Sequence, residues 1–207
     1  MTLYALYEQR ILIVLSERPR TAAAVFERLP GTLARKARNE VLARRELRRL
    51  SQPRPLSAFR TGAAEPATTL RRHYLEAERR FHVGWHVLAA VNYVESAFNK
   101  LRNTSTAGAQ GPMQFIPSTW RAYGLGGDVH DPHDAILGAA NYLHASGAPS
   151  DYRRALYHYN PSWRYVDAVL RYARRIRAEP RAFFVFHSRQ VFVRTPAGLV
   201  RLTGPGR

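Results

Sequence analysis

Hydrophobic positions recur at helical spacing over the first 50 residues of the chain. One apolar stripe, which falls on a single side of a helical wheel, consists of Leu33, Ala37, Val41 and Leu47. Arginines occupy much of the remaining surface. We therefore predict that residues 1 to about 50 are helical and favour a packed accessory helix with a solvated basic face. A helix that binds a membrane surface or nucleic acid is the alternative.

Two stretches interrupt the helical pattern. Residues 51–66 carry three prolines and little periodicity, which is typical of a linker. After Pro180 the chain becomes rich in Phe and Val, with breaks at 187–188 and 196–198, and this pattern predicts two or three short strands. The expected fold is mainly α: an N-terminal helical segment over 1–50, a linker over 51–66, a helical domain over 67–180 and a β-strand tail over 181–207.

Helix start and stop signals are clearest after residue 130. Asp131 suits an N-cap, Pro132 the first helical position and Asp134 the first turn, where a carboxylate favours the helix dipole. Gly147 suits the C-terminal stop of this helix. Two further N-caps are predicted, at Ser150 and Ser162.

Composition limits the class of protein. A chain of 207 residues with 45% hydrophobic and 11% aromatic residues can bury one principal core and is not disordered. Its net charge of +17 comes almost entirely from arginine, since Lys36 and Lys100 are the only lysines. Such a surface favours an anionic partner, namely nucleic acid, an anionic membrane or an acidic cell-wall polymer, or is simply solvated.

Cysteine is absent from the sequence, which excludes disulfides, thiolate metal sites and cysteine nucleophiles. No stretch approaches the roughly 20 apolar residues of a transmembrane helix. The apolar run 11–15 is shorter than the about 7–15 residues of a signal-peptide core, so either export uses another route or the true start lies upstream. We expect no cofactor and no metal, because no metal-ligand framework is formed by His82, His86, His130, His133, His144 and His158.

Glu95 lies where a helix would be expected to pack its apolar side. Residues 81–98 predict a helix in which Leu88, Val91 and Glu95 share one face, and Glu95 is the only acid between Glu78 and Asp128. Desolvation would raise the pKa of this carboxyl, which could then donate a proton to a leaving oxygen and later take one back. Alternatively, the side chain reaches solvent or backbone groups beyond the helix end.

The loop that follows combines turn formers with uncharged hydrogen-bonding groups. Glycines and a proline in "GAQGPMQF", residues 108–115, suit tight turns and close approach to a ligand. Gln110 and Gln114 offer amides that donate and accept, as sugar recognition requires. Met113 and Phe115 offer apolar surface for the faces of sugar rings.

Four ordered motifs resemble one known family. They are "ES", "GAxGxMQF-PSTW", "ANYL" and "YHYNPS", and over residues 70–177 they are similar to the SLT-type lytic transglycosylases of the goose-type lysozyme superfamily. The stretch from "GPMQF" to "ANYL" is also similar to the MltB-like branch. The resemblance implies a mostly helical lysozyme-like fold that cleaves peptidoglycan between N-acetylmuramic acid and N-acetylglucosamine. Two departures are a spacing from Glu95 to Gly108 one residue longer than in common members, and "YNPS" in place of "YNAG".

The resemblance also implies roles for individual residues. Glu95 matches the catalytic acid/base, and Tyr159 is expected to approach its carboxyl. Most of the candidate substrate-binding residues match motifs of the family, and Gln110 is included because its amide can donate and accept hydrogen bonds. The full set is Ser105, Gln110, Met113, Gln114, Phe115, Tyr142, Tyr159 and Asn160.

One glutamate without an obvious partner fits attack by the substrate's own groups, whereas ordinary glycosidases use two carboxylates. The expected product then carries a 1,6-anhydro ring. A hydrolytic muramidase on the same fold, or a non-catalytic basic module that binds wall or nucleic acid, is the alternative. We expect peptidoglycan glycan strands as the partner, association with anionic wall polymers, no use of nucleic acid and an extracytoplasmic location; the oligomeric state stays open.

Overall fold

The structure is a computed structural model that describes residues 2–205. Most of these residues are helical. In this part none of the helices is both long and apolar enough to cross a membrane. The elements are α1 Thr2–Glu17, α2 Pro19–Arg28, α3 Gly31–Leu50, a 3-10 turn Leu56–Ala58, α4 Ala67–Phe81, α5 Trp85–Ser96, α6 Pro117–Tyr123, α7 Pro132–Ala145, α8 Tyr152–Tyr159, α9 Trp163–Ala178, α10 Arg181–Ser188, β1 Phe192–Thr195 and β2 Gly198–Arg201. The predicted mainly α fold with a small C-terminal sheet is confirmed.

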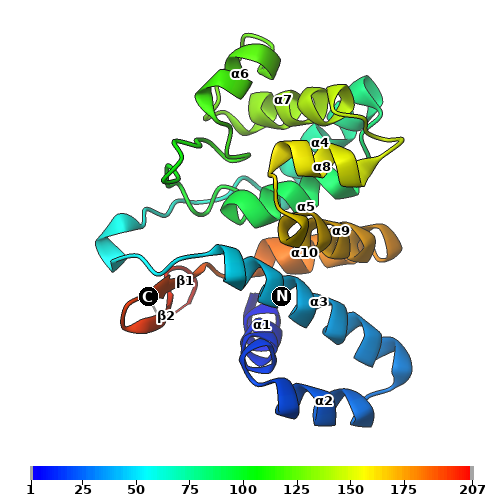
Figure 1. The fold of residues 1–207 in the computed structure, drawn as a ribbon, viewed down its shortest axis with the longest axis vertical. Helices are drawn as coiled ribbons and strands as arrows, with labels where there is room; N and C mark the ends of the chain where they lie inside the picture. Colours follow the sequence, from blue (N-terminus) through cyan, green and yellow to red (C-terminus); the bar gives the residue numbers. More distant parts are fainter. Residues whose placement is uncertain (1, 206–207) are drawn as a thin grey trace.

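Helices α1, α2 and α3 lie together at one end of the molecule (Figure 1). They share a small core built from Leu12, Leu15, Ala22, Phe26, Ala34 and Val41. The predicted stripe on α3 is wrong at Leu33, which is 49% exposed because it lies in the first turn, where the neighbouring Ala34 faces the small core instead. Further along α3, Ala43 reaches the main core and α3 packs on α9.

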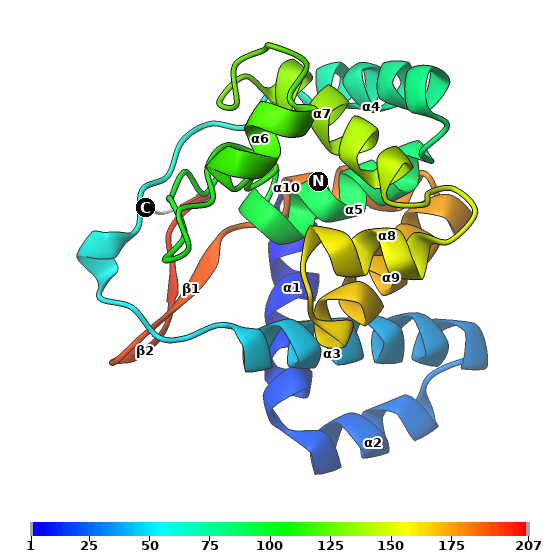
Figure 2. The ribbon, with the colours of Figure 1, turned by 45° about the horizontal axis from the view of Figure 1, so that its top comes forward.

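Helix α5 runs through the main core and positions the candidate catalytic glutamate. It contacts α4, α7, α9 and α10, which surround it in the view of Figure 2. Residues 87–91 are all at most 1% exposed, so the middle of this helix is apolar on every side, as expected of a buried helix. The helix begins at Trp85, later than the sequence suggested, because residues 82–84 form a break after α4.

The capping signals of the sequence are partly confirmed. The Asp131 side chain accepts a 3.0 Å hydrogen bond from the Asp134 amide at the start of α7, with Pro132 in the first turn. The cap predicted at Ser150 is wrong, since the carboxylate of the next residue, Asp151, accepts from the Arg154 amide. Ser162 is the N-cap of α9, although its side chain makes no capping bond.

The segment after Pro180 differs from its prediction as a β tail. Residues 181–188 form helix α10, and only 192–195 and 198–201 pair as an antiparallel hairpin. Phe183 and Phe186, one helical turn apart, are buried in the main core at 0% and 1% exposure. A short apolar run has the same appearance in a buried strand and a buried helix, and here the core selects the helix. Division of the chain into separate domains stays a prediction.

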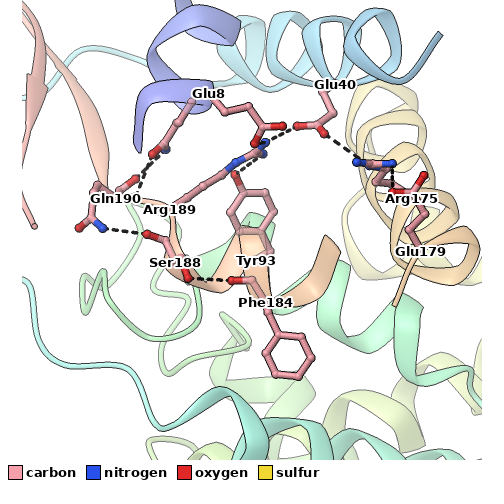
Figure 3. Close-up of polar contacts among 10 residues, drawn as sticks. Glu8, Glu40, Tyr93, Arg175, Glu179, Phe184, Ser188, Arg189 and Gln190 are labelled. Carbon is pink, nitrogen blue, oxygen red and sulfur yellow. Dashed lines mark hydrogen bonds and ion pairs between the residues drawn. The ribbon is translucent and has the colours of Figure 1, made fainter. Parts of the chain in front are cut away.

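A buried arginine connects the N-terminal helices to the rest of the protein (Figure 3). Arg189, just after α10, is 1% exposed and its Nη2 lies 2.9 Å from a Glu8 oxygen on α1 and 2.6 Å from a Glu40 oxygen on α3. Its Nη1 is 3.4 Å from the Tyr93 hydroxyl on α5. Beside it, the Gln9 amide donates to the Gln190 carbonyl at 2.8 Å. The N-terminal helices are therefore joined to α5 through a guanidinium group that is removed from water.

Candidate active site

Glu95 lies in the last turn of α5 and is partly buried. Burial raises the pKa of its carboxyl from 4.5 to about 7, and a hydrogen bond from Tyr165 opposes that rise. A carboxyl with this pKa is populated in both protonation states near neutral pH. It can therefore act as an acid and as a base, as the sequence predicted from its position among apolar residues.

The hydrogen-bond partner of this carboxyl was missed by the sequence analysis. The Tyr165 hydroxyl on α9 donates to Glu95 Oε1 at 2.6 Å. Tyr165 is 2% exposed, and burial together with the charge of Glu95 raises the pKa of its hydroxyl well above 10.0. The phenol therefore stays protonated and acts as a fixed donor. The only signal in the sequence was a tyrosine six residues after Tyr159 of the "YN" motif.

The hydroxyl of Tyr159 bonds elsewhere. It donates to the Met113 carbonyl at 2.7 Å and so attaches the end of α8 to the glycine-rich loop. Burial, followed by the nearby charge of Glu95, raises the pKa of this hydroxyl as well. Tyr159 thus lies near the carboxyl, as expected, but the hydrogen bond to the carboxyl comes from Tyr165.

The residues beside Glu95 fasten the loop to α5. The Pro112 carbonyl accepts from the Asn92 side-chain amide at 2.8 Å and from the Ser96 hydroxyl at 2.6 Å. Tyr74 on α4 donates to the Asn92 oxygen at 2.5 Å. Asn92 and Ser96 are both 1% exposed. These bonds give the serine of the "ES" motif a structural role, because it satisfies a buried carbonyl one residue before Met113.

Helix α5 ends directly after the catalytic candidate in a left-handed turn. Ala97, Phe98 and Asn99 have φ values of 51°, 62° and 65°. Each non-glycine residue in this region costs about 1–2 kcal/mol. Burial of the Phe98 ring, which is 0% exposed and 5.5 Å from the Tyr93 ring, offsets part of that cost. The turn stops the helix so that Glu95 stays near its end.

Two predicted substrate-binding residues hold the loop in shape. The Ser105 hydroxyl accepts from the amides of Ala107 and Ala109 at 3.2 and 3.0 Å. The Gln114 amide donates to the carbonyls of Asn103 and Gly111 at 3.1 and 3.0 Å. The Ser105 hydroxyl and the Gln114 side-chain nitrogen are therefore engaged by other groups of the loop. Gln110 pairs with Phe115 through both backbone groups, and its side chain forms no hydrogen bond with any residue between 2 and 205.

The prediction that Met113 and Phe115 offer apolar surface to sugar rings is wrong. Met113 and Phe115 are 0% and 2% exposed, because the loop turns both inward to complete the core. Their side chains have no free face for a sugar ring. The exposed apolar side chain at this place is Ile116, which is 37% exposed.

A row of aromatic rings continues from the loop. The Phe115 and Tyr159 ring centroids lie 5.9 Å apart, those of Tyr159 and Tyr142 5.5 Å, and those of Tyr142 and Tyr123 4.7 Å. The Tyr142 hydroxyl donates to the His158 carbonyl at 2.8 Å. Asn160 is the C-cap of α8, and its carbonyl accepts a hydrogen bond from the amide of Ser162, the N-cap of α9. The structure thus gathers Tyr142, Tyr159 and the loop, while a role for Asn160 in binding stays a prediction.

Comparison with known proteins identifies the family of the chain. A family model described as "Transglycosylase SLT domain" matches residues 73–176, which is half of the chain. The membrane-bound lytic murein transglycosylase F of Thiobacillus denitrificans is 38% identical over 74 residues, which cover 36% of this chain and 15% of that protein. A search of solved structures gave no match. The likeness to the MltB-like branch stays a prediction. The match to the family model includes Glu95, the glycine-rich loop and the tyrosine row, and the chain belongs to the transglycosylase SLT domain family.

Proposed function

We propose that this protein is a lytic transglycosylase that cleaves the β-1,4 bond between N-acetylmuramic acid and N-acetylglucosamine in peptidoglycan. The observation that carries the proposal is the single carboxyl of Glu95, whose pKa is raised to about 7 by burial and whose Oε1 accepts a hydrogen bond from Tyr165. Membership of the SLT family supports the same reaction class.

In the first step Glu95 donates its proton to the glycosidic oxygen as the bond from that oxygen to C1 breaks. The positive charge that develops at C1 is stabilised by the 2-acetamido group of the same sugar. Glu95, now a carboxylate, takes the proton from the C6 hydroxyl, and O6 bonds to C1 to close a 1,6-anhydro ring. No water is consumed, because both reacting groups belong to the substrate and are already close together.

The surroundings of Glu95 support the absence of a second catalytic carboxylate. Retaining glycosidases place two carboxyls about 5–5.5 Å apart, and inverting enzymes place them about 6.5–9.5 Å apart. A carboxylate at the shorter distance would raise the pKa of Glu95 by repulsion, yet the rise is caused by burial, and the hydrogen bond from Tyr165 opposes it. The acids that follow in sequence accept backbone amides: Asp128 from His130 and Asp131 from Asp134.

Tyr165 acts on the carboxyl rather than on the substrate. Its hydroxyl donates to Oε1, which leaves Oε2 as the oxygen that exchanges the proton with substrate. A hydrogen bond to the charged form favours that form, so Tyr165 stabilises the carboxylate after the first proton transfer. Together, burial and this bond keep the pKa of Glu95 near neutral pH, where both steps can proceed.

The partners in this proposal are glycan strands of peptidoglycan, and the expected location is the cell envelope outside the cytoplasm. The basic N-terminal helices would add attraction to anionic wall polymers through long-range charge. Tyr142, Tyr159 and Asn160 are the proposed contacts to the glycan.

Analysis of the products tests the reaction type. Purified peptidoglycan digested by the protein should release muropeptides with 1,6-anhydro ends, each one water lighter than a hydrolysed product and without a reducing end. Reducing, hydrated products would assign a muramidase that uses the same glutamate. Undigested peptidoglycan that sediments with the protein would assign a non-catalytic binding module.

A further inference from the structure

A cluster of histidines and carboxylates lies away from Glu95, between α4 and the start of α7. His73 and Glu76 are three residues apart on α4, and His133 is the second residue of α7. One ligand atom from each of these three residues lies within 4.8 Å of the other two. The His73 and His133 rings meet edge to face with their centroids 4.8 Å apart. Three groups able to bind a metal therefore converge from two helices.

The distance between two of the three ligand atoms fits a tetrahedral ion. Two ligand atoms that each lie about 2.0–2.1 Å from a zinc ion at a tetrahedral angle are about 3.3 Å apart. His133 Nε2 and Glu76 Oε2 lie 3.1 Å apart. Two imidazoles and a carboxylate are also a ligand set that suits Zn²⁺ better than Mg²⁺ or Ca²⁺, which prefer oxygen alone.

Each histidine has a further carboxylate beside it. His133 Nδ1 lies 3.5 Å from Asp134 Oδ1, and His73 Nε2 lies 3.3 Å from Glu65 Oε2. That Glu65 oxygen is buried and accepts no hydrogen bond within residues 2–205. Carboxylates in this position orient a metal-binding imidazole and make it a better ligand.

We propose that His73, Glu76 and His133 bind one Zn²⁺ ion that joins α4 to the start of α7. A water molecule completes the tetrahedron, and Glu65 and Asp134 orient the two histidines. The ion reaches the site from solvent beside Glu76, whose side chain is 47% exposed. The site is structural: it fixes the end of the linker, α4 and α7, and takes no part in the reaction at Glu95. The sequence analysis did not consider this cluster, because His133 is 57 residues from Glu76 and comes close only in the fold.

The test uses the untagged full chain, stripped with a chelator and titrated with zinc chloride in a calorimeter. We expect one saturable site per chain and a melting temperature that rises with zinc, since an ion that binds the folded state stabilises it. His133→Ala and Glu76→Gln should abolish that site and the thermal shift. Glu65→Gln should weaken zinc binding by about 10–100-fold. His144→Ala, which removes an exposed histidine at the other end of α7, is the matched control and should bind as the wild type does.

Two outcomes would overturn the proposal. Titration without a saturable one-to-one site would show that these side chains only make polar contacts with one another and bind no ion. Equal binding by wild type, His133→Ala and Glu76→Gln would place the ion elsewhere. Glu76 has a side chain that is 47% exposed, so its replacement tests the ligand even if the histidine variant folds poorly.

Discussion

Tyr165 donates a 2.6 Å hydrogen bond to Oε1 of Glu95 from a helix that begins 68 residues further along the chain. This bond favours the carboxylate, while burial favours the protonated acid, and their balance places the pKa of Glu95 at about 7. The protonation state of the candidate catalytic group therefore depends on a residue outside the known motifs of the sequence.

Replacing this tyrosine should change the pH dependence of activity. In Tyr165→Phe the carboxylate loses a charge-assisted hydrogen bond, so the pKa of Glu95 should rise further, by about one unit. The alkaline limb of kcat/KM should then move to higher pH. Loss of orientation should lower kcat about 10-fold. Clearing of peptidoglycan suspensions across a pH series measures both effects.

Tyr172→Phe is the matched control, because Tyr172 is a tyrosine on the same helix with the same 2% exposure. Its hydroxyl forms no hydrogen bond to Glu95. This variant should keep the wild-type pH profile. A Tyr165→Phe enzyme with an unchanged profile would mean that Tyr165 only packs against the carboxyl.

Glu95→Gln should lose catalysis while gaining stability at alkaline pH. The amide cannot transfer a proton, so turnover should fall by at least about 10²–10⁴-fold, with glycan binding retained. The pKa of Glu95 is raised from 4.5 to about 7 in the folded state, so between these values the folded protein holds more protons than the unfolded chain. The free energy of unfolding of the wild type therefore decreases as pH rises from about 4.5 to 7.

The glutamine variant lacks this decrease and should be more stable than wild type at pH 8 by about 1–3 kcal/mol, after allowance for partial exposure. Urea denaturation at pH 5 and pH 8 measures the difference. Glu179→Gln should differ from wild type by nearly the same amount at pH 5 and pH 8, because a hydrogen bond from Lys36 lowers the pKa of Glu179 below 4.5 and its titration affects stability only at lower pH. Parallel pH curves for wild type and Glu95→Gln would show that the carboxyl titrates normally.

Alanine substitutions at two glycines of the loop should distinguish the cost of backbone strain from the cost of a steric clash. Gly108 and Gly111 have φ values of 81° and 73°, so alanine at either position costs about 1–2 kcal/mol. A Cβ at Gly108 would meet nothing within 4 Å, whereas one at Gly111 would lie 1.9 Å from the Val129 carbonyl oxygen. Gly111→Ala should therefore lower the free energy of unfolding by about 1–3 kcal/mol more than Gly108→Ala. Equal losses in chemical denaturation would mean that the loop moves freely from Val129.

The parts of the fold that the sequence predicted depend on local signals. Asp131, Pro132 and Gly147 mark the two ends of one helix, and the apolar surroundings of Glu95 follow from its own turn of α5. Contacts between distant segments have no such signal. Tyr165 is 70 residues from Glu95 and Arg189 is 149 from Glu40.

Burial explains the remaining differences. Met113 and Phe115 lie in a loop motif that looks suited to ligand contact, but the core takes both side chains. The same competition turned residues 181–188 from expected strands into helix α10, since Phe183 and Phe186 fill the core only when they share one helical face.

The basic surface of the N-terminal helices should tune binding to the wall more than catalysis. Not all of its arginines are available, since Arg45 donates to the carbonyls of Leu15 and Ser16. The exposed arginines that form no salt bridge in the part of the chain the structure covers include Arg18, Arg20, Arg28 and Arg35. Sedimentation with insoluble peptidoglycan should weaken as salt rises, and replacing these four with glutamine should reduce that dependence. Binding that is constant across the salt series would mark the surface as merely solvated.

The buried arginine beside α5 should be among the most costly single charges to remove. Arg189→Met leaves Glu40, which is 5% exposed, with only a distant contact to Arg175 at 3.8 Å. An uncompensated buried charge costs about 3–5 kcal/mol in the free energy of unfolding.

Arg153→Met is the comparison for Arg189→Met, because it breaks a 2.8 Å pair with Asp167 in which both side chains are about half exposed. Its cost should stay below about 1 kcal/mol. Adding Glu40→Gln to Arg189→Met should recover part of the loss, because the stranded charge is then gone, and denaturation of the single and double variants measures this coupling. If the double variant is no more stable than Arg189→Met, the arginine contributes through its packing on Phe186, whose ring centroid lies 4.5 Å from the guanidinium carbon, and not through its charge.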